Sequence, residues 1–218
     1  MKDKILKATK TNFKIASNCL KRGGVIVTPS DTNLVLTLDP WDDSAVKRAF
    51  TIKNRSDNAP LTLFFLHPAD WMLYSIAKNN RTIEKLIRTF WPGPLNIILE
   101  AKESVPAKIL CGGSTVSMGC LRNPTWRGFM EEYRKPVTMT SANLSGQADG
   151  VLVDMDTVIE QVAERVDYIL EGSAQGTTTS STIVDMTSDI PVIIRMGDVT
   201  PNDIEKAIGI KPKINLVK

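Results

Sequence analysis

The stretch "RGGVIVTPSDTNLVL", residues 22–36, decides the fold of this chain. Residues 25–28 and 35–38 are mostly apolar runs with the length of buried strands, which are typical of a sheet covered on both faces. The glycines at 23–24 end a preceding helix. Because the polar segment 30–33 joins the two runs, the stretch predicts a helix, a buried strand, a short polar loop and a second buried strand.

Outward from this stretch, strands alternate with helices along the chain. The clearest helix has apolar residues at i, i+3, i+4 and i+7, starting at Ile83. Such alternation predicts an α/β sheet that is partly parallel and covered on both faces. The other expected strands are residues 61–66, 95–99, 116–121, 137–140, 168–170, 182–184 and 192–194, and the other expected helices are residues 13–20, 42–53, 125–133, 156–165 and 201–208.

Composition favours one globular domain. The 218-residue chain is 42% hydrophobic and 23% charged, which is ordinary for a folded protein. Its net charge of +3 is close to balanced and does not by itself indicate a nucleic-acid-binding protein. Since no repeat or shift in composition divides the chain, we expect one domain over residues 12–209, with an N-terminal extension (1–11) and a C-terminal tail (210–218).

Cysteine usage and hydropathy predict the location of the protein. Cys19, Cys111 and Cys120 are an odd number without the spacing of a zinc site, which favours a reducing, cytoplasmic environment. No apolar run approaches the about 18 residues that span a membrane, and the N-terminus lacks the apolar region of a secretory signal. The single histidine, His67, precedes Pro68, and we expect it in a solvated loop rather than as a catalytic base.

Four polar segments lie near the ends of expected strands, where α/β proteins usually bind ligands. They are "TPSDT" (28–32), "KNR" (53–55), "TSANLSG" (140–146) and "RMG" (195–197). Each alone has an ordinary explanation, such as a turn, a helix cap or a surface charge. Together they supply Lys and Arg side chains for phosphate oxygens and a loop that can cradle a phosphate. They favour a nucleotide site that is neither GxxxxGK[ST] nor GxGxxG in type.

Seven short motifs follow one another in a recognisable order: "PSDTNLVL" (29–36), "KNR" (53–55), "FWPGPLN" (90–96), "RNP" (122–124), "SANLSG" (141–146), "STIVD" (181–185) and "RMG" (195–197). In this order they resemble the YrdC-like family, whose best-known members are threonylcarbamoyl-AMP synthases. The family pattern runs PT[ED]TxYGL, KxR, FWPGPLT, RxP, SAN.SG, STV.D and RxG. The resemblance covers roughly residues 12–209, and it implies a twisted mixed sheet flanked by helices, with a positive concave cleft.

The resemblance also implies an activity. Family members are nucleotidyltransferases that take ATP, L-threonine and bicarbonate and release pyrophosphate with threonylcarbamoyl-AMP. A partner transferase passes the threonylcarbamoyl group to an adenosine of tRNA, and Mg²⁺ shares the charge of the phosphates. Two alternatives remain open: a related enzyme that forms a carbamoyl-type adenylate on another small amino acid or acceptor, and a non-catalytic module that binds tRNA or double-stranded RNA.

The positions of residues within these motifs indicate which of them belong to the binding site. As the resemblance implies, Lys53 and Arg55 hold the ATP phosphates and are the catalytic pair. The same nucleotide site is completed by Thr140, Ser141, Asn143 and Arg195. The amino acid and its carboxylate are faced by Thr32, Arg122, Ser181 and Thr182. No residue is expected as a dedicated metal ligand.

The chain departs from the family pattern beside the first motif. Leu34 and Val35 stand where the family has Tyr-Gly, and Phe64 stands where some members have His. We expect these changes to remove a hydroxyl and an aromatic wall from the amino-acid pocket. Since a pocket that loses a polar partner discriminates less sharply, the sequence predicts relaxed or altered selectivity for the amino acid.

Overall fold

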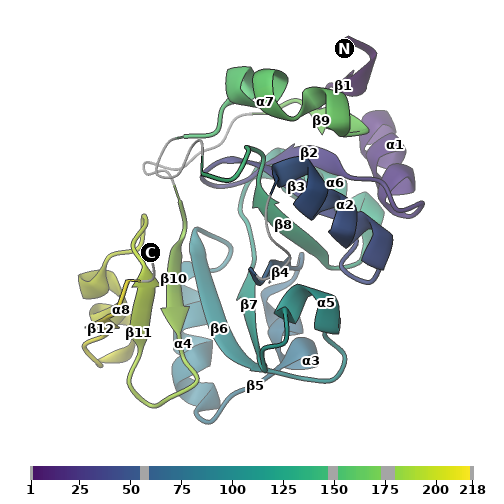
Figure 1. The fold of residues 1–218 in the computed structure, drawn as a ribbon. Coiled ribbons are helices and arrows are strands. Elements are labelled where there is room, and N and C mark those ends of the chain that lie inside the picture. Colours follow the sequence, from purple (N-terminus) through teal and green to yellow (C-terminus); the bar gives the residue numbers. More distant parts are fainter. Residues whose placement is uncertain (1, 55–58, 147–151, 173–179, 217–218) are drawn as a thin grey trace.

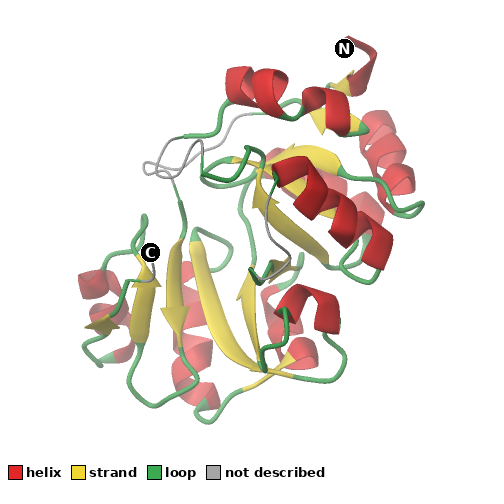
Figure 2. Cartoon of the chain, in the orientation of Figure 1, coloured by secondary structure: helices red, strands yellow, loops and turns green. Residues whose placement is uncertain are grey.

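The computed structural model describes residues 2–54, 59–146, 152–172 and 180–216. Within these ranges the chain forms one strongly twisted, twelve-stranded mixed sheet with helices packed on it (Figures 1 and 2). The strand order is β1-β9-β2-β3-β8-β4-β7-β6-β10-β11-β12, and β5 pairs with β6 outside this path. The predicted α/β fold with a twisted mixed sheet is therefore confirmed.

The strands are β1 (Ile5–Leu6), β2 (Ile26–Pro29), β3 (Leu34–Leu38), β4 (Thr62–Phe64), β5 (Ser75–Ile76), β6 (Leu95–Ala101), β7 (Thr115–Gly119), β8 (Val137–Ser141), β9 (Tyr168–Leu170), β10 (Thr182–Asp185), β11 (Val192–Arg195) and β12 (Lys213–Ile214). The α-helices are α1 (Lys10–Leu20), α2 (Asp43–Lys53), α3 (Trp71–Tyr74), α4 (Asn80–Phe90), α5 (Ala107–Leu110), α6 (Pro124–Tyr133), α7 (Met155–Gln161) and α8 (Pro201–Ile208), with 3-10 turns at Lys2–Lys4, Pro68–Asp70 and Ala163–Arg165.

The opening stretch folds as predicted into two paired strands. β2 and β3 are antiparallel, with Val27 opposite Leu36. β3 continues antiparallel into β8, which pairs antiparallel with β4. Further along the sheet, β4 with β7 and β6 with β10 are parallel pairs. The loop between β2 and β3 therefore lies at one edge of the central strands, near the end of β8.

Side chains alternate across the sheet and form two cores. Leu36 and Leu63 belong to the larger core, which also takes buried residues of α2, α4 and α8. Val35 and Phe64 point to the other face and belong to a smaller core with α1 and α6. Because successive residues of a strand point to opposite faces, neighbouring residues here serve different cores. The cavity described below opens on the face of the smaller core.

Helix ends follow ordinary capping chemistry. The Asp42 carboxylate accepts from the backbone N–H groups of Ser44 and Ala45 at the start of α2. Thr200 and Asp203 form a reciprocal capping box at the start of α8. These caps support the predicted starts of both helices.

The structure also contains elements that the sequence did not predict. β1 pairs with β9 and β12 pairs with β11, so residues of both terminal segments add short strands to the sheet. β4 covers only part of the predicted strand 61–66. In the described ranges, no helix is long and apolar enough to cross a bilayer.

Candidate functional site

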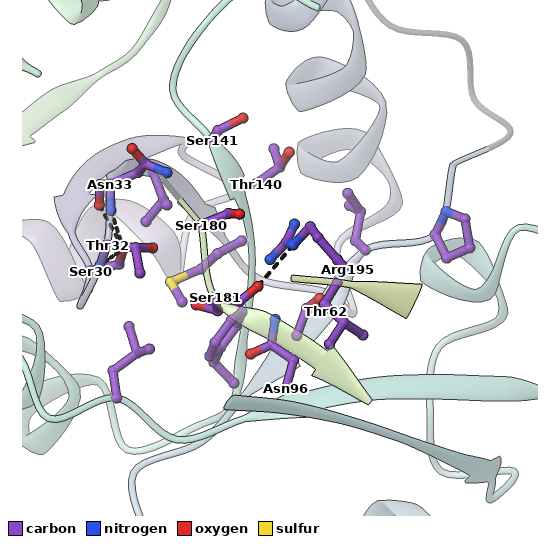
Figure 3. Close-up of a pocket in the computed structure, with 17 residues that line it drawn as sticks. Ser30, Thr32, Asn33, Thr62, Asn96, Thr140, Ser141, Ser180, Ser181 and Arg195 are labelled. Carbon is purple, nitrogen blue, oxygen red and sulfur yellow. Dashed lines mark hydrogen bonds between the residues drawn. The ribbon is translucent and has the colours of Figure 1, made fainter. Parts of the chain in front are cut away.

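A cavity of about 300 Å³ opens on the central strands. Figure 3 shows Ser30, Thr32 and Asn33 on one side of it, and Arg195, Thr62 and Asn96 on the other. β3, β4, β6, β8, β10 and β11 all contribute side chains, so residues far apart in sequence share one space. The lining residues are Ser30, Thr32, Asn33, Val35, Pro60, Leu61, Thr62, Phe64, Asn96, Leu121, Met139, Thr140, Ser141, Ser180, Ser181, Ile183 and Arg195.

Ser30 closes the loop between β2 and β3 onto itself. Its hydroxyl donates to the carbonyl oxygen of Asn33 at 2.6 Å. It also accepts from the backbone N–H groups of Thr32 at 3.2 Å and Asn33 at 3.0 Å. A serine that bonds its own backbone in this way makes a compact turn. The turn leaves the side chains of Thr32 and Asn33 on the cavity wall.

Asp31 ties this loop to the start of α6. It is fully buried, and its carboxylate accepts from the backbone N–H of Asn123 at 2.8 Å and of Arg122 at 3.1 Å. The Asn123 amide donates back to the Ser30 carbonyl oxygen at 3.0 Å. Burial raises the pKa of Asp31 above its ordinary value, although the two backbone N–H groups oppose this. Asp31 is thus a structural acceptor rather than a cavity residue.

Lys53 lies under the loop that begins at Ser141. It is 3% exposed, and its ammonium donates to the carbonyl oxygens of Ser141 at 2.5 Å and Asn143 at 2.8 Å. It also bonds the Ser141 hydroxyl at 3.2 Å and the Asn143 side-chain oxygen at 3.3 Å. The backbone N–H of Ser145 returns a bond to the Lys53 carbonyl at 2.8 Å. Lys53 therefore holds this loop in place at the edge of the cavity.

Arg195 brings positive charge to the cavity wall. Its Nε donates to the carbonyl oxygen of Ser181 at 2.9 Å, which fixes the guanidinium at the end of β11. Although the residue remains exposed to solvent, the surrounding atoms desolvate it and lower its pKa from the ordinary value. An arginine stays protonated in proteins, so the side chain is a cation at neutral pH. Among the described lining residues there is no Asp, Glu, His or Cys.

The structure places the other predicted site residues differently. The Thr182 hydroxyl donates to the Val199 carbonyl at 2.7 Å and accepts from its N–H at 3.1 Å, so it is engaged away from the cavity. The side chain of Arg122 lines a second cavity, of about 360 Å³, beside Phe90 and Asp203. Arg55 lies outside the described residues. Thr32, Thr140, Ser141, Ser181 and Arg195 are the predicted site residues that share the first cavity.

Two of the departures from the family pattern expected to alter the amino-acid pocket reach this cavity. Val35 and Phe64 line it. The side chain of Leu34, in contrast, is buried in the larger core. Alternation along β3 sends the Leu34 side chain to the opposite face, so it forms no wall of this cavity.

Sequence reasoning missed Asn96, Thr62 and Met139 as lining residues. The sequence did contain a signal for Asn96 and Thr62. Asn96 interrupts the apolar run of β6, and Thr62 stands between Leu61 and Leu63. A polar residue on the buried face of a strand needs a partner, which often means a site.

Reactive side chains outside the cavity are inert or distant. Burial raises the pKa of Cys19 to about 11 and that of Cys120 to about 12. His67 is exposed at the start of a 3-10 turn, beside Asp70 and Arg134 in a separate hollow. In the part of the chain that the structure describes, no three His, Cys, Asp or Glu residues are grouped to hold a metal ion. Among the described residues, the cavity lining offers hydroxyl, amide and guanidinium groups that can bind and orient a ligand.

The chain matches a family model described as "Telomere recombination", which covers the Sua5, YciO and YrdC proteins, over residues 18–197. A threonylcarbamoyl-AMP synthase of Pyrococcus abyssi is 31% identical over 199 residues. That match covers 90% of this chain but 57% of the relative. The chain thus spans little more than half the length of this curated relative.

Solved structures of Sua5 and YciO proteins have folds similar to that of this chain. Sua5 of P. abyssi complexed with L-threonine superposes with a TM-score of 0.90 at 27% identity, over 97% of this chain and 62% of that one. YciO of Escherichia coli superposes with a TM-score of 0.77 at 25% identity, over 90% of this chain and 97% of that one. The second comparison matches this chain over nearly the full length of its neighbour.

Proposed function

The chain belongs to the Sua5/YciO/YrdC family, and from this we propose that it is a nucleotidyltransferase that makes threonylcarbamoyl-AMP from ATP, L-threonine and bicarbonate. The observation that carries the proposal is the meeting of two motif groups in one cavity. Thr32 and Ser181, expected to face the amino acid, line the same space as Ser141 and Arg195, expected to face ATP. The proposal places the amino acid and the α-phosphate of ATP side by side at this cavity.

The proposed reaction needs positioning more than covalent catalysis. The amine of threonine attacks the carbon of bicarbonate-derived CO₂ and loses a proton, which gives a carbamate. A carbamate oxygen then attacks the α-phosphorus of ATP, and the bond to pyrophosphate breaks. Holding these groups in line and neutralising the phosphate charge lower the barrier without a protein nucleophile. This fits a cavity whose described lining has no nucleophilic thiol and no carboxylate.

Each predicted ATP residue has a distinct place in this proposal. Arg195 pairs with phosphate oxygens from the cavity wall. Ser141 and Thr140 offer hydroxyls there, while Lys53 and Asn143 hold the Ser141 loop in shape. Arg55 remains a proposed phosphate-binding residue on its motif alone.

Fewer structural contacts support the proposed amino-acid-binding site than support the proposed ATP site. Thr32 and Ser181 face the cavity. Thr182 and Arg122 remain proposals from the resemblance, and their side chains would have to turn to reach the ligand.

The described residues do not fit a protein-held Mg²⁺. Magnesium prefers carboxylate ligands and water in near-octahedral geometry, and the described residues that line the cavity include no carboxylate. We therefore assign Mg²⁺, as a companion of ATP, to the phosphates themselves. A threonylcarbamoyl transferase and tRNA are the proposed downstream partners, in the cytoplasm.

The test is pyrophosphate release from ATP with bicarbonate and single amino acids, with the product identified by mass spectrometry. Arg195→Ala should lower kcat/KM for ATP at least about hundredfold. Arg88→Ala is the matched control, because Arg88 is an exposed arginine on α4 that pairs with Glu84 across one helical turn. Equal activity of both variants would overturn the phosphate role of Arg195.

The alternatives have their own outcomes in this experiment. Turnover with an acceptor other than threonine would indicate a carbamoyl-adenylate enzyme of another specificity. Absence of turnover, together with RNA binding that weakens steeply with salt, would favour the RNA-binding module.

A further inference from the structure

Asn96 carries a side-chain amide that has no hydrogen-bond partner within the described structure. The residue is 4% exposed, and its Oδ1 is buried without a partner. It lines the cavity from β6, opposite Ile183 of β10. Figure 3 shows the amide directed from the strand into the cavity, with the nitrogen towards the space that Ser181 and Arg195 border. Buried amides are nearly always paired, so this one points to a ligand.

The position of the amide is set by packing rather than by hydrogen bonds. A Cβ atom added to Gly119 would lie 2.8 Å from Oδ1 of Asn96 and 2.5 Å from Cε1 of Phe64. The amide and the aromatic ring therefore share the space above Gly119. The χ2 torsion of asparagine is broad, so the amide can turn and present both Oδ1 and Nδ2 to the cavity.

We propose that Asn96 is a substrate-contacting residue that determines which amino acid is bound, by pairing with an N–H group beside a carboxylate oxygen. This inference rests on the proposed function and deepens it. A side-chain amide offers one acceptor and one donor along a single edge. An α-amino acid and its carbamate both present an N–H next to an anionic oxygen, which complements that edge. The partner that Oδ1 lacks is thus supplied by the ligand.

The surroundings of Asn96 support this ligand class. Arg195, on the same side of the cavity as Asn96, adds positive charge to the space that holds the carboxylate and the phosphates. Phe64, Leu121 and Ile183 give apolar walls around the amide, which strengthen a hydrogen bond by excluding water. A nucleotide base would also pair with an amide edge, but its ring would need the space that these side chains fill.

Asn96 is also a departure from the family pattern. It stands at the last position of "FWPGPLN", where the family has Thr. Val35 and Phe64, and the more conservative changes at Ser30 and Ile183, are further departures on the wall of the same cavity. Changes gathered around one space indicate that this end of the cavity was altered as a unit.

The experiment compares Asn96→Leu and Asn96→Thr with wild type. Asn96→Leu keeps the branching and the number of side-chain heavy atoms but removes both hydrogen-bonding atoms, so KM for the amino acid should rise at least about tenfold while KM for ATP stays within about twofold. Asn96→Thr restores the residue of the family pattern and should keep binding of threonine while changing the rank order of amino acids. Ile97→Val, on the same strand but with its side chain in the larger core and not on the cavity wall, is the control for altered packing alone.

A second measurement does not depend on turnover. The side-chain amide signals of Asn96, assigned by ¹⁵N NMR from their loss in Asn96→Thr, should shift when wild type is titrated with L-threonine. Titration with bicarbonate also present distinguishes the carbamate from the free amino acid. Unmoved signals in both titrations, or an unchanged KM for the amino acid in Asn96→Leu, would overturn the inference. If wild type releases no pyrophosphate, the proposed function fails, and the NMR titrations alone decide the role of Asn96.

Discussion

The ammonium of Lys53 lies 2.8 Å from the carbonyl oxygen of Asn143, in a hydrogen-bond network that also includes Ser141. A lysine from the end of α2 thereby fixes a loop that follows β8, about ninety residues later in the chain. Ionic hydrogen bonds of this kind are stronger than neutral ones. The shape of the loop that begins at Ser141, which we propose binds the ATP phosphates, thus depends on a residue that does not line the cavity.

Replacing Lys53 by Met should therefore lower both stability and ATP binding. The change leaves buried carbonyl oxygens unpaired, which should reduce the free energy of unfolding by about 2–3 kcal/mol. Urea denaturation and an ATP titration measure the two effects. Lys47→Met, at an exposed lysine of the same helix, should change neither. A stable Lys53→Met protein that still fails to bind ATP would instead place the Lys53 ammonium on the phosphates.

Asp31 should matter for stability through its backbone hydrogen bonds. Asp31→Ala removes the acceptor for the N–H groups of Arg122 and Asn123 and should cost about 2–3 kcal/mol. Asp31→Asn keeps one acceptor oxygen and should cost less. Denaturant unfolding of the two variants measures the difference. Equal losses would show that the charge, not the hydrogen bonds, is what the loop requires.

The raised pKa of Asp31 predicts a specific pH dependence. Because burial raises its pKa in the folded state, the folded protein binds this proton more tightly than the unfolded chain. The contribution of Asp31 to stability should thus fall as the pH rises from the ordinary value of 3.8 through the raised one. Asp31→Asn does not titrate, so the advantage of wild type over this variant should be greatest in acid. An advantage that grows with pH would contradict the direction of the shift.

The cysteines should react in a set order. Burial raises the pKa of Cys19 to about 11 and that of Cys120 to about 12, so about 0.1% or less of either is thiolate near pH 8. Cys111 is partly exposed and should be alkylated first by iodoacetamide. Peptide mass spectrometry identifies the labelled residue, and labelling in urea shows that all three can react. Early labelling of Cys120 would mean that its surroundings open in the native protein.

Selectivity should follow the residues that line the cavity. With Val35 and Phe64 on its wall, we expect a preference for threonine over serine below about tenfold in kcat/KM. Val35→Gly and Phe64→His restore residues of the family pattern and should sharpen it. Leu34→Tyr is the informative control, because its side chain lies in the larger core and should cost stability without changing selectivity. A wild-type preference as sharp as that of a typical family member would contradict relaxed selectivity.

Local sequence patterns were sufficient for much of the fold. The apolar run at β9 and the capped, periodic segment at α8 were predicted with the bounds that the structure gives them. Each depends on residues within a few positions of one another. Strands as short as β1 and β12 have no such signal, since two residues form a strand only because a neighbour is there to pair with.

The site was harder to predict for the same reason. The hydrogen bond from the Asn123 N–H to Asp31 joins residues 92 positions apart, and no local sequence pattern around either residue predicts the other. Ser181 and Arg195, from two motifs, line one cavity in the structure, but the motifs could not indicate that the neighbouring Thr182 hydroxyl bonds Val199. Side-chain direction and long-range pairing are properties of the packed sheet, and they decide which member of a motif meets the ligand.

The absence of a side chain at Gly119 couples two residues of the cavity wall, Phe64 and Asn96. The ring of Phe64 and the amide of Asn96 both occupy the volume that a side chain at residue 119 would need. A change at any of these positions alters the room left for the other two, so the effects of substitutions there should not add. We expect this corner of the pocket to be epistatic: a new specificity would be reached only when the three positions change in a compatible order.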